Sequence, residues 1–426
     1  MSETPPSSAA TRAAHRATFF RQSGWMMLAT IIGGVLMWAV HLLSKAIPAA
    51  EYGTLITLLS VVNLIPTLPL QMVFTQQTAL AHVNGRTAQL AGLLRWTGFS
   101  LLGAGLLGAL GLTTLRRQLT TDWHLVNPAA LPLLLVVILL SLSLPVFSGI
   151  MQGRQNFLWL GWSAIFNGAG RITSAVLIVL VGHGLATGIM VAVAAGLVAA
   201  CALGAWQTQA QWRTPPEPFD HKIIFGQVLP LMLGFGATQF LFSADTAFVN
   251  LYFGPERTAP YGAAGTLARA LLWLVLPLAG VLFPKIVHSH AKSENASLLG
   301  ISLLITGAFA GLGFLGLWLL GPWIVPLIFP AAYAPETLAV LPWYAAAMIP
   351  LALGNLLVND LLARSRFRVV PALMLVAATY GVALTKYHAS PKLILQLLAG
   401  FNLLLLVVCV GFVWREKKYG KPGPPD

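Results

Sequence analysis

Three charged residues lie deep inside long apolar stretches of the sequence: Arg171, Asp245 and Arg269. If those stretches cross a membrane, each charge is costly unless it is paired or hydrated, which makes each one a candidate functional group. The guanidinium fork of arginine can bind two oxygens of a phosphate or carboxylate at once. The chemistry that these residues predict is therefore recognition of an anion within the membrane.

The three charges are predicted to lie at a similar depth, about seven to ten residues from the outer ends of their spans. We expect Arg171, in the first half of the chain, to face a cavity shared with Asp245 and Arg269 of the second half. Asp245 would there tune Arg269, or take up a proton or a cation. Met37 favours this interpretation, because it occupies the position of Asp245 in the first half, and a pair required by the fold would recur.

The alternative is structural. Asp245 and Arg269 would form an ion pair between neighbouring helices, and Arg171 would bond to backbone carbonyls or extend towards the membrane surface. A second pair, Asp360 and Arg364, has the four-residue spacing of an ion pair on one helix face, and we expect it to be structural.

Polar residues without charge also interrupt the apolar stretches. Asn63, Asn167 and Asn355 are candidate sugar-contacting groups. Interhelical hydrogen bonds, worth under about 2 kcal/mol each, account for the other amides in these stretches. His41 is expected to be a buried neutral imidazole.

No resident cofactor is expected. The nine histidines have no H-x-x-x-H or H-E-x-x-H spacing and the two cysteines form no C-x-x-C pair, so the sequence offers no metal motif. The glycine runs at 103–111 and 311–321 lack a following G-K-[ST], so they are not phosphate loops; we expect them to let helices approach closely. Any coupling would then use a proton or sodium gradient.

Composition dictates the elements that hold these residues. Hydrophobic residues make up 57% of the 426 and charged residues 9%, against roughly 25% charged in soluble domains. Apolar runs long enough to cross a hydrocarbon core recur throughout. The fold class is predicted to be an all-α polytopic membrane protein with about twelve transmembrane helices. The spans are placed at 21–44, 53–81, 90–112, 130–151, 157–181, 185–206, 223–252, 260–285, 297–320, 337–362, 368–386 and 392–414.

Lysine and arginine fix the expected orientation, since they concentrate in cytoplasmic loops. Seventeen lie on one side of the predicted topology and six on the other, so both termini are placed in the cytoplasm. The short basic loops follow the topology and form no stripe interleaved with aromatics, so no nucleic-acid partner is expected despite a net charge of +13. The aromatic, proline-rich segment 321–336 is expected to lie along the outer interface.

An internal repeat divides the chain into two similar halves. Matches recur in order at an offset of 208 to 210 residues. They are Tyr52-Gly53 with Tyr261-Gly262, Pro69-Leu70 with Pro277-Leu278, His82 with His290, Arg154-x-x-Phe157 with Arg364-x-x-Phe367, and Cys201 and Trp206 with Cys409 and Trp414. Six spans in each half predict parallel repeats, a plan used by transporters that rock one half against the other.

The predicted organisation has five parts: a cytoplasmic tail (1–20), an N-terminal six-helix lobe (21–206), a cytoplasmic linker (207–222), a C-terminal six-helix lobe (223–414) and a cytoplasmic tail (415–426). The two lobes are expected to form pseudo-symmetric bundles. No loop is long enough to hold an extramembranous catalytic domain.

Two stretches carry a family resemblance. They are SKAIPAAEYGTLITLLSVVNLIPTLPLQMVF (44–74) and SADTAFVNLYFGPERTAPYGAAGTLARALLWLVLPLAGVLFPKI (243–286). Both contain a Tyr-Gly turn between spans and prolines in the span that follows. They resemble the multidrug/oligosaccharidyl-lipid/polysaccharide (MOP) exporter superfamily, in particular its polysaccharide-flippase branch, and the six-plus-six plan extends the resemblance over the chain.

The resemblance implies a flippase of the bacterial inner membrane. It would translocate a lipid-linked oligosaccharide of the undecaprenyl-pyrophosphate type, or a related polysaccharide precursor, by alternating access. Membrane lipids, a polysaccharide polymerase and glycosyltransferases would be its partners. One alternative is a multidrug or organic-cation exporter, which would need a carboxylate-rich cavity. Another is a membrane-bound polymerase or ligase of cell-envelope sugars, but the outer carboxylates, Glu51, Asp122, Glu256 and Glu336, lie apart in sequence and the outer loops are short.

Overall fold

The computed structural model describes residues 24–182, 185–220, 222, 224–289 and 295–419, with the backbone alone at 224, 273–289, 295–298 and 416–419. The predicted tails (1–20 and the end of 415–426) and the repeat partner His290 lie outside the described residues, as does the side chain of Pro277. Throughout the described part the secondary structure is helical, which confirms the predicted all-α class.

The first half begins with a helix at 24–38, which continues as the 3₁₀ helix η1 (Ala39–Ala46). The elements that follow are α2 (Ala49–Asn63), α3 (Leu68–Asn84), α4 (Thr87–Asp122), α5 (Ala130–Gly153), α6 (Phe157–Leu180), α7 (Ala186–Gln207) and the short α8 (Gln209–Arg213). Helix α8 lies inside the segment that the sequence predicts as the linker between lobes.

The second half begins with a π-helical turn, η2 (Ile224–Val228). It continues with α9 (Leu229–Phe253), α10 (Pro255–Ser289), α11 (Asn295–Ile328), η3 (Ala331–Tyr333), α12 (Ala334–Ala363), η4 (Phe367–Val369), α13 (Val370–Lys386) and α14 (Pro391–Tyr419). Eleven described helical segments are long and apolar enough to cross a membrane. One of them, Phe225–Leu272, has 48 residues and holds both α9 and the start of α10, which makes twelve crossings.

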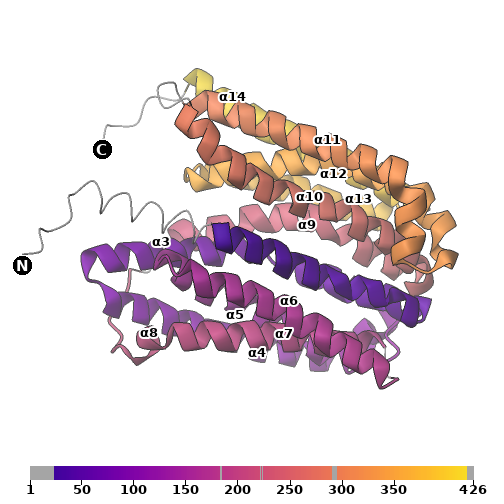
Figure 1. Ribbon diagram of the computed structural model, residues 1–426, viewed down its shortest axis with the longest axis horizontal. Coiled ribbons are helices and arrows are strands. Elements are labelled where there is room, and N and C mark those ends of the chain that lie inside the picture. The colour runs from indigo at the N-terminus through magenta and orange to yellow at the C-terminus, as the bar shows by residue number, and fades with distance from the viewer. Residues whose placement is uncertain (1–23, 183–184, 221, 223, 290–294, 420–426) are drawn as a thin grey trace, which may run out of the picture.

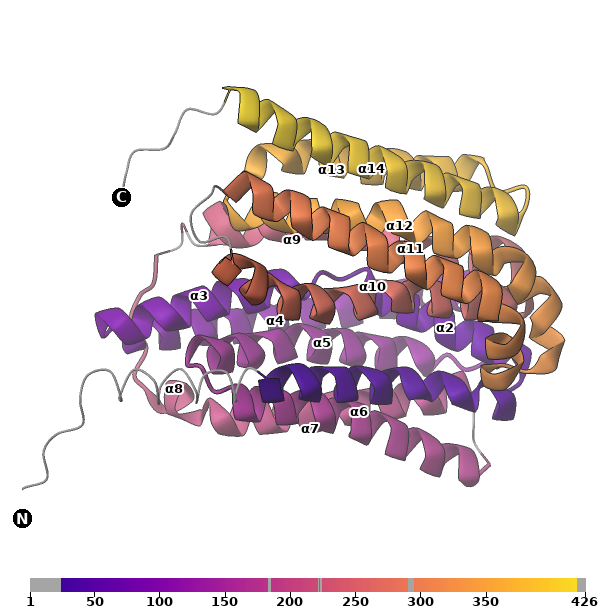
Figure 2. The same ribbon diagram turned by 45° about the horizontal axis from the view of Figure 1, so that its top comes forward.

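The helices form two bundles. In Figure 1 the indigo and magenta elements of the first half pack below the pink, orange and yellow elements of the second half, and Figure 2 shows the same division from another side. The start of the first, indigo helix and the end of α14 lie at the same end of the molecule (Figure 1), as an even number of crossings requires. We call the bundles the N-lobe (24–207) and the C-lobe (224–415).

The second predicted span, 53–81, is broken in the middle. Helix α2 ends at Asn63 and α3 begins at Leu68, with Pro66 in the non-helical residues between them. Proline removes a backbone donor and clashes with the preceding turn, which favours a break at this position. The hydroxyl of Ser243 on α9 donates to the carbonyl oxygen of Ser60 at 2.9 Å. A side chain of the C-lobe thereby satisfies backbone of the N-lobe beside the break.

Several helices run past the hydrophobic spans that the sequence predicts. Helix α4 continues to Asp122, about ten residues beyond the predicted end at 112, and carries exposed Arg116 and Arg117. Helix α11 continues to Ile328, with Pro322 and Pro326 inside it. Hydropathy locates the part of a helix that lies in hydrocarbon, whereas its hydrogen-bonded end is set by caps and turns.

The aromatic segment 321–336 is therefore divided between two environments. Trp323 on α11 is 70% exposed, as a residue of an interfacial belt would be. Phe329 and Tyr333 are instead buried, and their rings pack on Tyr52 of the N-lobe at centroid distances of 6.1 and 6.2 Å. Half of this segment thus forms part of the contact between lobes.

Besides the bond between Ser243 and Ser60, hydrogen bonds join the lobes at one end of the molecule, which we call the junction end. There the ammonium group of Lys45 donates to the carbonyl oxygen of Leu327 at 2.9 Å. On the other side of the interface, the amide of Asn250 on α9 donates to the carbonyl oxygen of Trp123, which follows α4, at 3.1 Å. The junction end is the right-hand end in Figure 1, and the lysine and arginine count predicts that it faces outward.

The repeated Tyr-Gly dipeptides lie where α2 crosses α10. A Cβ atom on Gly53 would lie 1.9 Å from the carbonyl oxygen of Pro255, and one on Gly262 would lie 2.6 Å from a side-chain carbon of Ile56. Each glycine of the repeat therefore faces the helix of the opposite lobe. The absence of a side chain brings the α2 backbone at Gly53 against the backbone of α10, and it lets the side chain of Ile56 pack on the α10 backbone at Gly262.

The glycine runs that the sequence singles out let neighbouring helices approach closely at some of their positions. Cβ atoms on Gly105 and Gly108 would lie 2.8 Å from side-chain carbons of Leu139 and Leu135, and one on Gly313 would lie 2.5 Å from a side-chain carbon of Leu271. In the run at 311–321, Cβ atoms on Gly311 and Gly316 would have no neighbour within 4 Å. The backbone contacts are elsewhere: Gly149 and Gly153 of α5 lie against the backbone of α3, and Gly196 of α7 lies against that of α6. These single glycines, spaced by four in α5, are typical of membrane helix interfaces.

Candidate functional site

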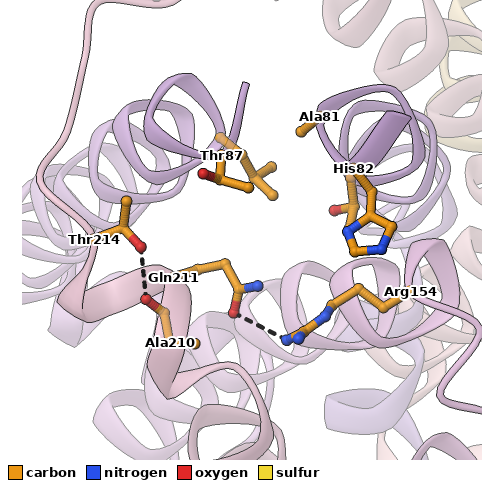
Figure 3. Close-up of a pocket in the computed structure, with 9 residues that line it drawn as sticks. Ala81, His82, Thr87, Arg154, Ala210, Gln211 and Thr214 are labelled. Atoms are coloured by element: carbon orange, nitrogen blue, oxygen red, sulfur yellow. Dashed lines mark hydrogen bonds between the residues drawn. The ribbon is translucent and has the colours of Figure 1, made fainter. Parts of the chain in front are cut away.

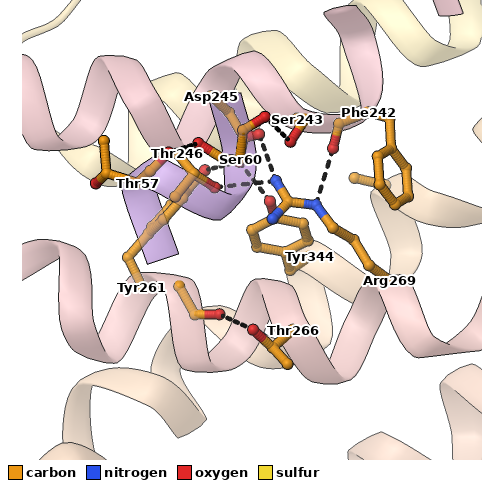
Figure 4. A network of polar contacts seen from close by, with 12 residues as sticks. Thr57, Ser60, Phe242, Ser243, Asp245, Thr246, Tyr261, Thr266, Arg269 and Tyr344 are labelled. Carbon is orange, nitrogen blue, oxygen red and sulfur yellow. Dashed lines mark hydrogen bonds and ion pairs between the residues drawn. The ribbon is translucent and has the colours of Figure 1, made fainter. Parts of the chain in front are cut away.

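Asp245 and Arg269 form a buried ion pair inside the C-lobe. Nη2 of Arg269 lies 2.7 Å from Oδ1 of Asp245, and the two side chains are 10% and 0% exposed. Gly254, with a φ of 78°, separates α9 from α10, and the two helices fold back on each other so that the charges meet (Figure 4). This is the pairing that the sequence offered as its structural alternative.

Every polar atom of the Asp245 carboxylate is engaged. Tyr261 of α10 donates to Oδ2 at 2.9 Å, and the hydroxyl of Tyr344 on α12 donates to the same oxygen. Arg269 also donates to the carbonyl oxygen of Phe242 at 2.8 Å and to the hydroxyl of Thr246 at 2.9 Å. Figure 4 shows these groups converging from three helices on the carboxylate and guanidinium. We call Asp245, Thr246, Tyr261, Arg269 and Tyr344 the C-lobe cluster.

Aromatic rings complete the surroundings of the pair. The guanidinium carbon of Arg269 lies 5.4 Å from the ring centroids of both Phe242 and Tyr344, within the range of cation–π attraction. Tyr380 of α13 is fully buried and lies within electrostatic range of Asp245, and its hydroxyl has no hydrogen-bond partner in the described part of the chain. The C-lobe cluster therefore joins α9, α10 and α12 through a pair whose charges cancel.

Arg171 has a different environment. It lies on α6 in the N-lobe, half-buried, and its Nε atom is buried with no hydrogen-bond partner among the described residues. Arg171 forms no ion pair with the described residues, and it interacts electrostatically with His41. The Nδ1 atom of His41 lies 3.0 Å from the hydroxyl of Tyr52. No carboxylate of the described residues compensates the charge of this guanidinium, which lies on a membrane-spanning helix.

The two lobes differ at equivalent positions. At the repeat offset of 209 residues, Arg171 corresponds to Tyr380, and Tyr52 corresponds to Tyr261. In the C-lobe the tyrosine of the repeat donates to a carboxylate, whereas in the N-lobe it meets an imidazole. The pseudo-symmetric fold therefore places an uncompensated cation in one lobe and a neutralised pair in the other.

The three candidate asparagines are not brought together. Asn167 lies one turn before Arg171 on α6, and both residues border Gly196 of α7. Asn63 is exposed at the end of α2, beside the break in the second span. Asn355 on α12 accepts a hydrogen bond from Asn359 through its backbone carbonyl at 2.8 Å and through its side-chain oxygen at 3.3 Å.

The tyrosines of the C-lobe cluster were missed as functional candidates. In the sequence, Tyr261 marks only the repeat. Nothing next to Tyr344, or next to its buried neighbour Tyr380, distinguishes either tyrosine from an apolar aromatic residue. The available signal was a hydroxyl in the middle of an apolar span, where a polar atom needs a partner.

The described residues hold no group of three His, Cys, Asp or Glu side chains arranged as metal ligands. His41 is half-buried and bonded to Tyr52. The sequence predicts interhelical hydrogen bonds for the remaining amides. Asn402 makes one within the C-lobe, since it donates from α14 to the carbonyl oxygen of Ala347 on α12 at 2.9 Å.

Asp360 and Arg364 form the predicted helical ion pair, with Nη2 of Arg364 at 2.8 Å from Oδ1 of Asp360. The arginine side chain is 46% exposed. We expect Arg364→Gln to lower the free energy of unfolding by no more than about 0.5 kcal/mol, because exposed i,i+4 pairs contribute little. Thermal unfolding of the purified protein in detergent measures this, and a fall of several degrees in the midpoint would contradict it.

Comparisons with known proteins place the chain by its fold. No protein-family model matches the sequence, and no curated protein matches it. Solved structures match over nearly the whole chain. An inward-facing multidrug resistance MATE family transporter of the MOP superfamily has a TM-score of 0.63 at 12% identity, covering 95% of this chain and 96% of that one.

Two further structures agree with the first. A MOP superfamily transporter from Pyrococcus furiosus, described as having a binding pocket of reverse polarity that suggests a different function, has a TM-score of 0.62 at 13% identity, with coverage of 94% and 95%. A MATE protein in the straight conformation has a TM-score of 0.63 at 13% identity, again with coverage of 94% and 95%. The chain has the fold of the MATE transporters of the MOP superfamily.

Proposed function

We propose that this protein is a flippase-like transporter that moves a lipid-linked oligosaccharide, or a related polysaccharide precursor, across the bacterial inner membrane. Alternating access between the N-lobe and the C-lobe would carry out the transfer. Two supports for transport are the fold shared with MATE transporters and the hydrogen bonds between lobes at the junction end. Interfaces of that kind can open at one end while the lobes remain intact.

The balance of charge inside the membrane supports an anionic cargo. Asp245 is neutralised by Arg269 and saturated by two tyrosines, so it has no free oxygen to offer a cation. Arg171 carries the charge that no described side chain compensates. A cation held in this way is stabilised by an anion brought by the cargo, and a guanidinium suits the oxygens of a pyrophosphate. The proposal rests on this one observation, that no described side chain compensates the charge of Arg171.

The neighbouring asparagine fits the same cargo. Asn167 precedes Arg171 by one helical turn on the same face, so an anionic headgroup at Arg171 would place its sugar within reach of the amide. Asn63 is exposed in the middle of a membrane span, where a polar side chain is favoured only beside water or polar cargo. Asn355 would join the path by exchanging its bond to Asn359 for one to the cargo.

The proposed setting follows from the charge bias of the loops. Both termini lie in the cytoplasm, the junction end faces outward, and a polysaccharide polymerase and glycosyltransferases supply or consume the cargo. Coupling to a proton or sodium gradient is part of the proposal only if transport proves to be uphill.

A second candidate is export of organic cations. The observation that favours it is the likeness to a multidrug resistance transporter. Under this function Asp245 would have to exchange Arg269 for the cargo, which means breaking a pair held by five hydrogen bonds. The anionic cargo needs no such rearrangement.

Purified protein reconstituted in liposomes separates the two candidates. A fluorescent prenyl-pyrophosphate oligosaccharide in the inner leaflet is scored by its exposure to a membrane-impermeant quencher, and efflux of a cationic dye is followed in a parallel sample, each against protein-free liposomes. We expect accelerated translocation of the oligosaccharide and dye efflux at the protein-free rate. The reverse pattern would assign the protein to cation export and make Asp245 its central residue.

A further inference from the structure

A pocket that several polar side chains line lies in the N-lobe at the end opposite the junction end. Its volume is about 230 Å³, enough for a small anion with its hydration. It is formed where α3 ends, α4 begins, α5 ends and α8 crosses them (Figure 3). The lining residues are Thr78, Ala81, His82, Thr87, Leu90, Arg154, Ala210, Gln211 and Thr214. None of these nine residues is a carboxylate, and we call the space the α3–α8 pocket.

The polar groups of the α3–α8 pocket are mostly hydrogen-bond donors. Figure 3 shows the imidazole of His82, the guanidinium of Arg154 and the side chain of Thr87 around the same space. Thr87 is the first residue of α4, a helix of 36 residues. The first amide groups of a helix have no partners within it and favour an anion. A cationic side chain and a helix N-terminus thus converge on one cavity.

A buried hydroxyl in the α3–α8 pocket has no partner. Thr78 is 2% exposed, yet its Oγ1 atom makes no hydrogen bond in the described part of the chain. Thr75, one turn earlier on α3, donates to the carbonyl oxygen of Gln71 at 2.7 Å, the usual arrangement for a helical threonine. A buried hydroxyl without a partner costs about 1–3 kcal/mol, so a ligand oxygen at this position would be stabilising.

The pocket is held in shape from two sides. Gln211 of α8 accepts a hydrogen bond from Arg154, at 3.1 Å in the amide orientation that also lets it donate to the carbonyl oxygen of Thr208 at 2.8 Å. Gly153 packs against Thr78, since a Cβ atom there would lie 2.6 Å from that of the threonine. Arg154 is therefore positioned before any ligand arrives.

The repeat shows that Arg154 differs from its counterpart in the C-lobe. At an offset of 210 residues Arg154 corresponds to Arg364, which donates to Asp360 through both Nε and Nη2. The residue four positions before Arg154 is Ile150, which is buried in apolar packing. The N-lobe arginine thus lacks the carboxylate of its twin and faces a cavity lined by donors.

We propose that the α3–α8 pocket binds a phosphate group. Arg154 and His82 would contact its oxygens, Thr78 would supply a buried hydroxyl, and the amino end of α4 would add backbone donors. The phosphate could belong to the headgroup of an anionic lipid or to a soluble phosphate compound. Because α8 belongs to the segment that joins the lobes, a bound phosphate would tie that segment to α3, α4 and α5.

Binding is measured on the full-length protein without reference to transport. One sample is detergent-solubilised protein titrated with inorganic phosphate, followed by thermal unfolding, with chloride at equal ionic strength as the control. The other is protein in nanodiscs of phosphatidylcholine with or without phosphatidic acid, followed by native mass spectrometry of retained lipid. We expect stabilisation or retention by phosphate in at least one sample, weakened about tenfold or more in Arg154→Gln.

Matched variants make the result specific. Arg364→Gln removes the twin arginine and should leave phosphate binding unchanged, while Thr78→Val keeps the shape of the side chain, loses the unpartnered hydroxyl and should weaken binding. Retention of phosphatidic acid without an effect of inorganic phosphate identifies a lipid site, and an effect of inorganic phosphate in detergent identifies a soluble ligand. Equal losses in Arg154→Gln and Arg364→Gln, or binding in neither sample, would overturn the proposal.

Discussion

Replacing Arg269 with alanine is expected to lower the free energy of unfolding by about 3–5 kcal/mol, because it leaves the carboxylate of Asp245 buried and without its counter-charge. Both side chains are almost fully removed from solvent, so water cannot replace the lost partner. The hydroxyls of Tyr261 and Tyr344 would still donate to Asp245, but they carry no charge. Thermal unfolding in detergent, followed by tryptophan fluorescence, measures the loss.

A double variant distinguishes an ion pair that stabilises the fold from one that transport requires. Asp245→Asn combined with Arg269→Met removes both charges and keeps similar volumes, so it should regain most of the stability lost in Arg269→Ala. Arg364→Gln is the control for an exposed pair. If Arg269→Ala unfolds like the wild type but loses transport, the C-lobe cluster is a functional site and the structural interpretation fails.

Gly53→Ala is expected to shift the protein away from the conformation described here. The new Cβ atom would lie 1.9 Å from the carbonyl oxygen of Pro255, and neither helix backbone can move aside while the lobes stay in contact. Overpacking of this kind costs about 1–3 kcal/mol, which changes the ratio of two conformations by roughly 5- to 150-fold. The C-lobe and N-lobe should each remain folded, because the strain lies between them.

The shift can be followed by disulfide formation across the junction end. Cysteines at positions 44 and 328 replace residues whose hydroxyl and carbonyl oxygen lie 3.4 Å apart, and they should link several-fold more slowly in Gly53→Ala than in the unaltered background. Gly236→Ala is the matched control between lobes, since its Cβ atom would meet Pro66 at an ordinary 3.7 Å. Equal linking rates in the two variants would show that the α2–α10 crossing does not limit the junction.

The helical plan of the molecule follows from local sequence features. Apolar length predicts the crossings, and the Tyr-Gly repeat singles out Gly53 and Gly262, both of which lie at the α2–α10 crossing. The four-residue spacing of Asp360 and Arg364 likewise predicts their contact, because neighbours on one helix are set by the helical period.

The partners of the buried charges depend on tertiary structure that the sequence does not reveal. The sequence offered two environments for Asp245, and the choice depended on Tyr261 and Tyr344, which reach it from α10 and α12. The span predicted at 53–81 is broken between Asn63 and Leu68, and the sequence does not reveal this, because a proline in a membrane helix is compatible with a kink or with a break. Beside the break, Ser243 of the other lobe adds a hydrogen bond to the carbonyl oxygen of Ser60, a contact that the local sequence does not reveal.

The α3–α8 pocket was invisible for a similar reason. Arg154 and His82 were used as markers of the repeat, and nothing local shows that these two exposed side chains border the same pocket. Arg154 differs from Arg364 in two ways that matter together. Ile150 replaces the carboxylate that pairs with Arg364, and Gln211 of α8 contacts the Arg154 side chain at the pocket.

The central claim is that the uncompensated guanidinium of Arg171 holds an anionic headgroup during transfer. The most direct test is the translocation rate of fluorescent prenyl-pyrophosphate oligosaccharide in liposomes containing Arg171→Ala, Arg171→Lys or wild-type protein at equal, verified amounts of folded protein. We predict a loss of about tenfold or more for alanine and a smaller loss for lysine, which keeps the charge but not the fork. Wild-type rates in Arg171→Ala would contradict the claim.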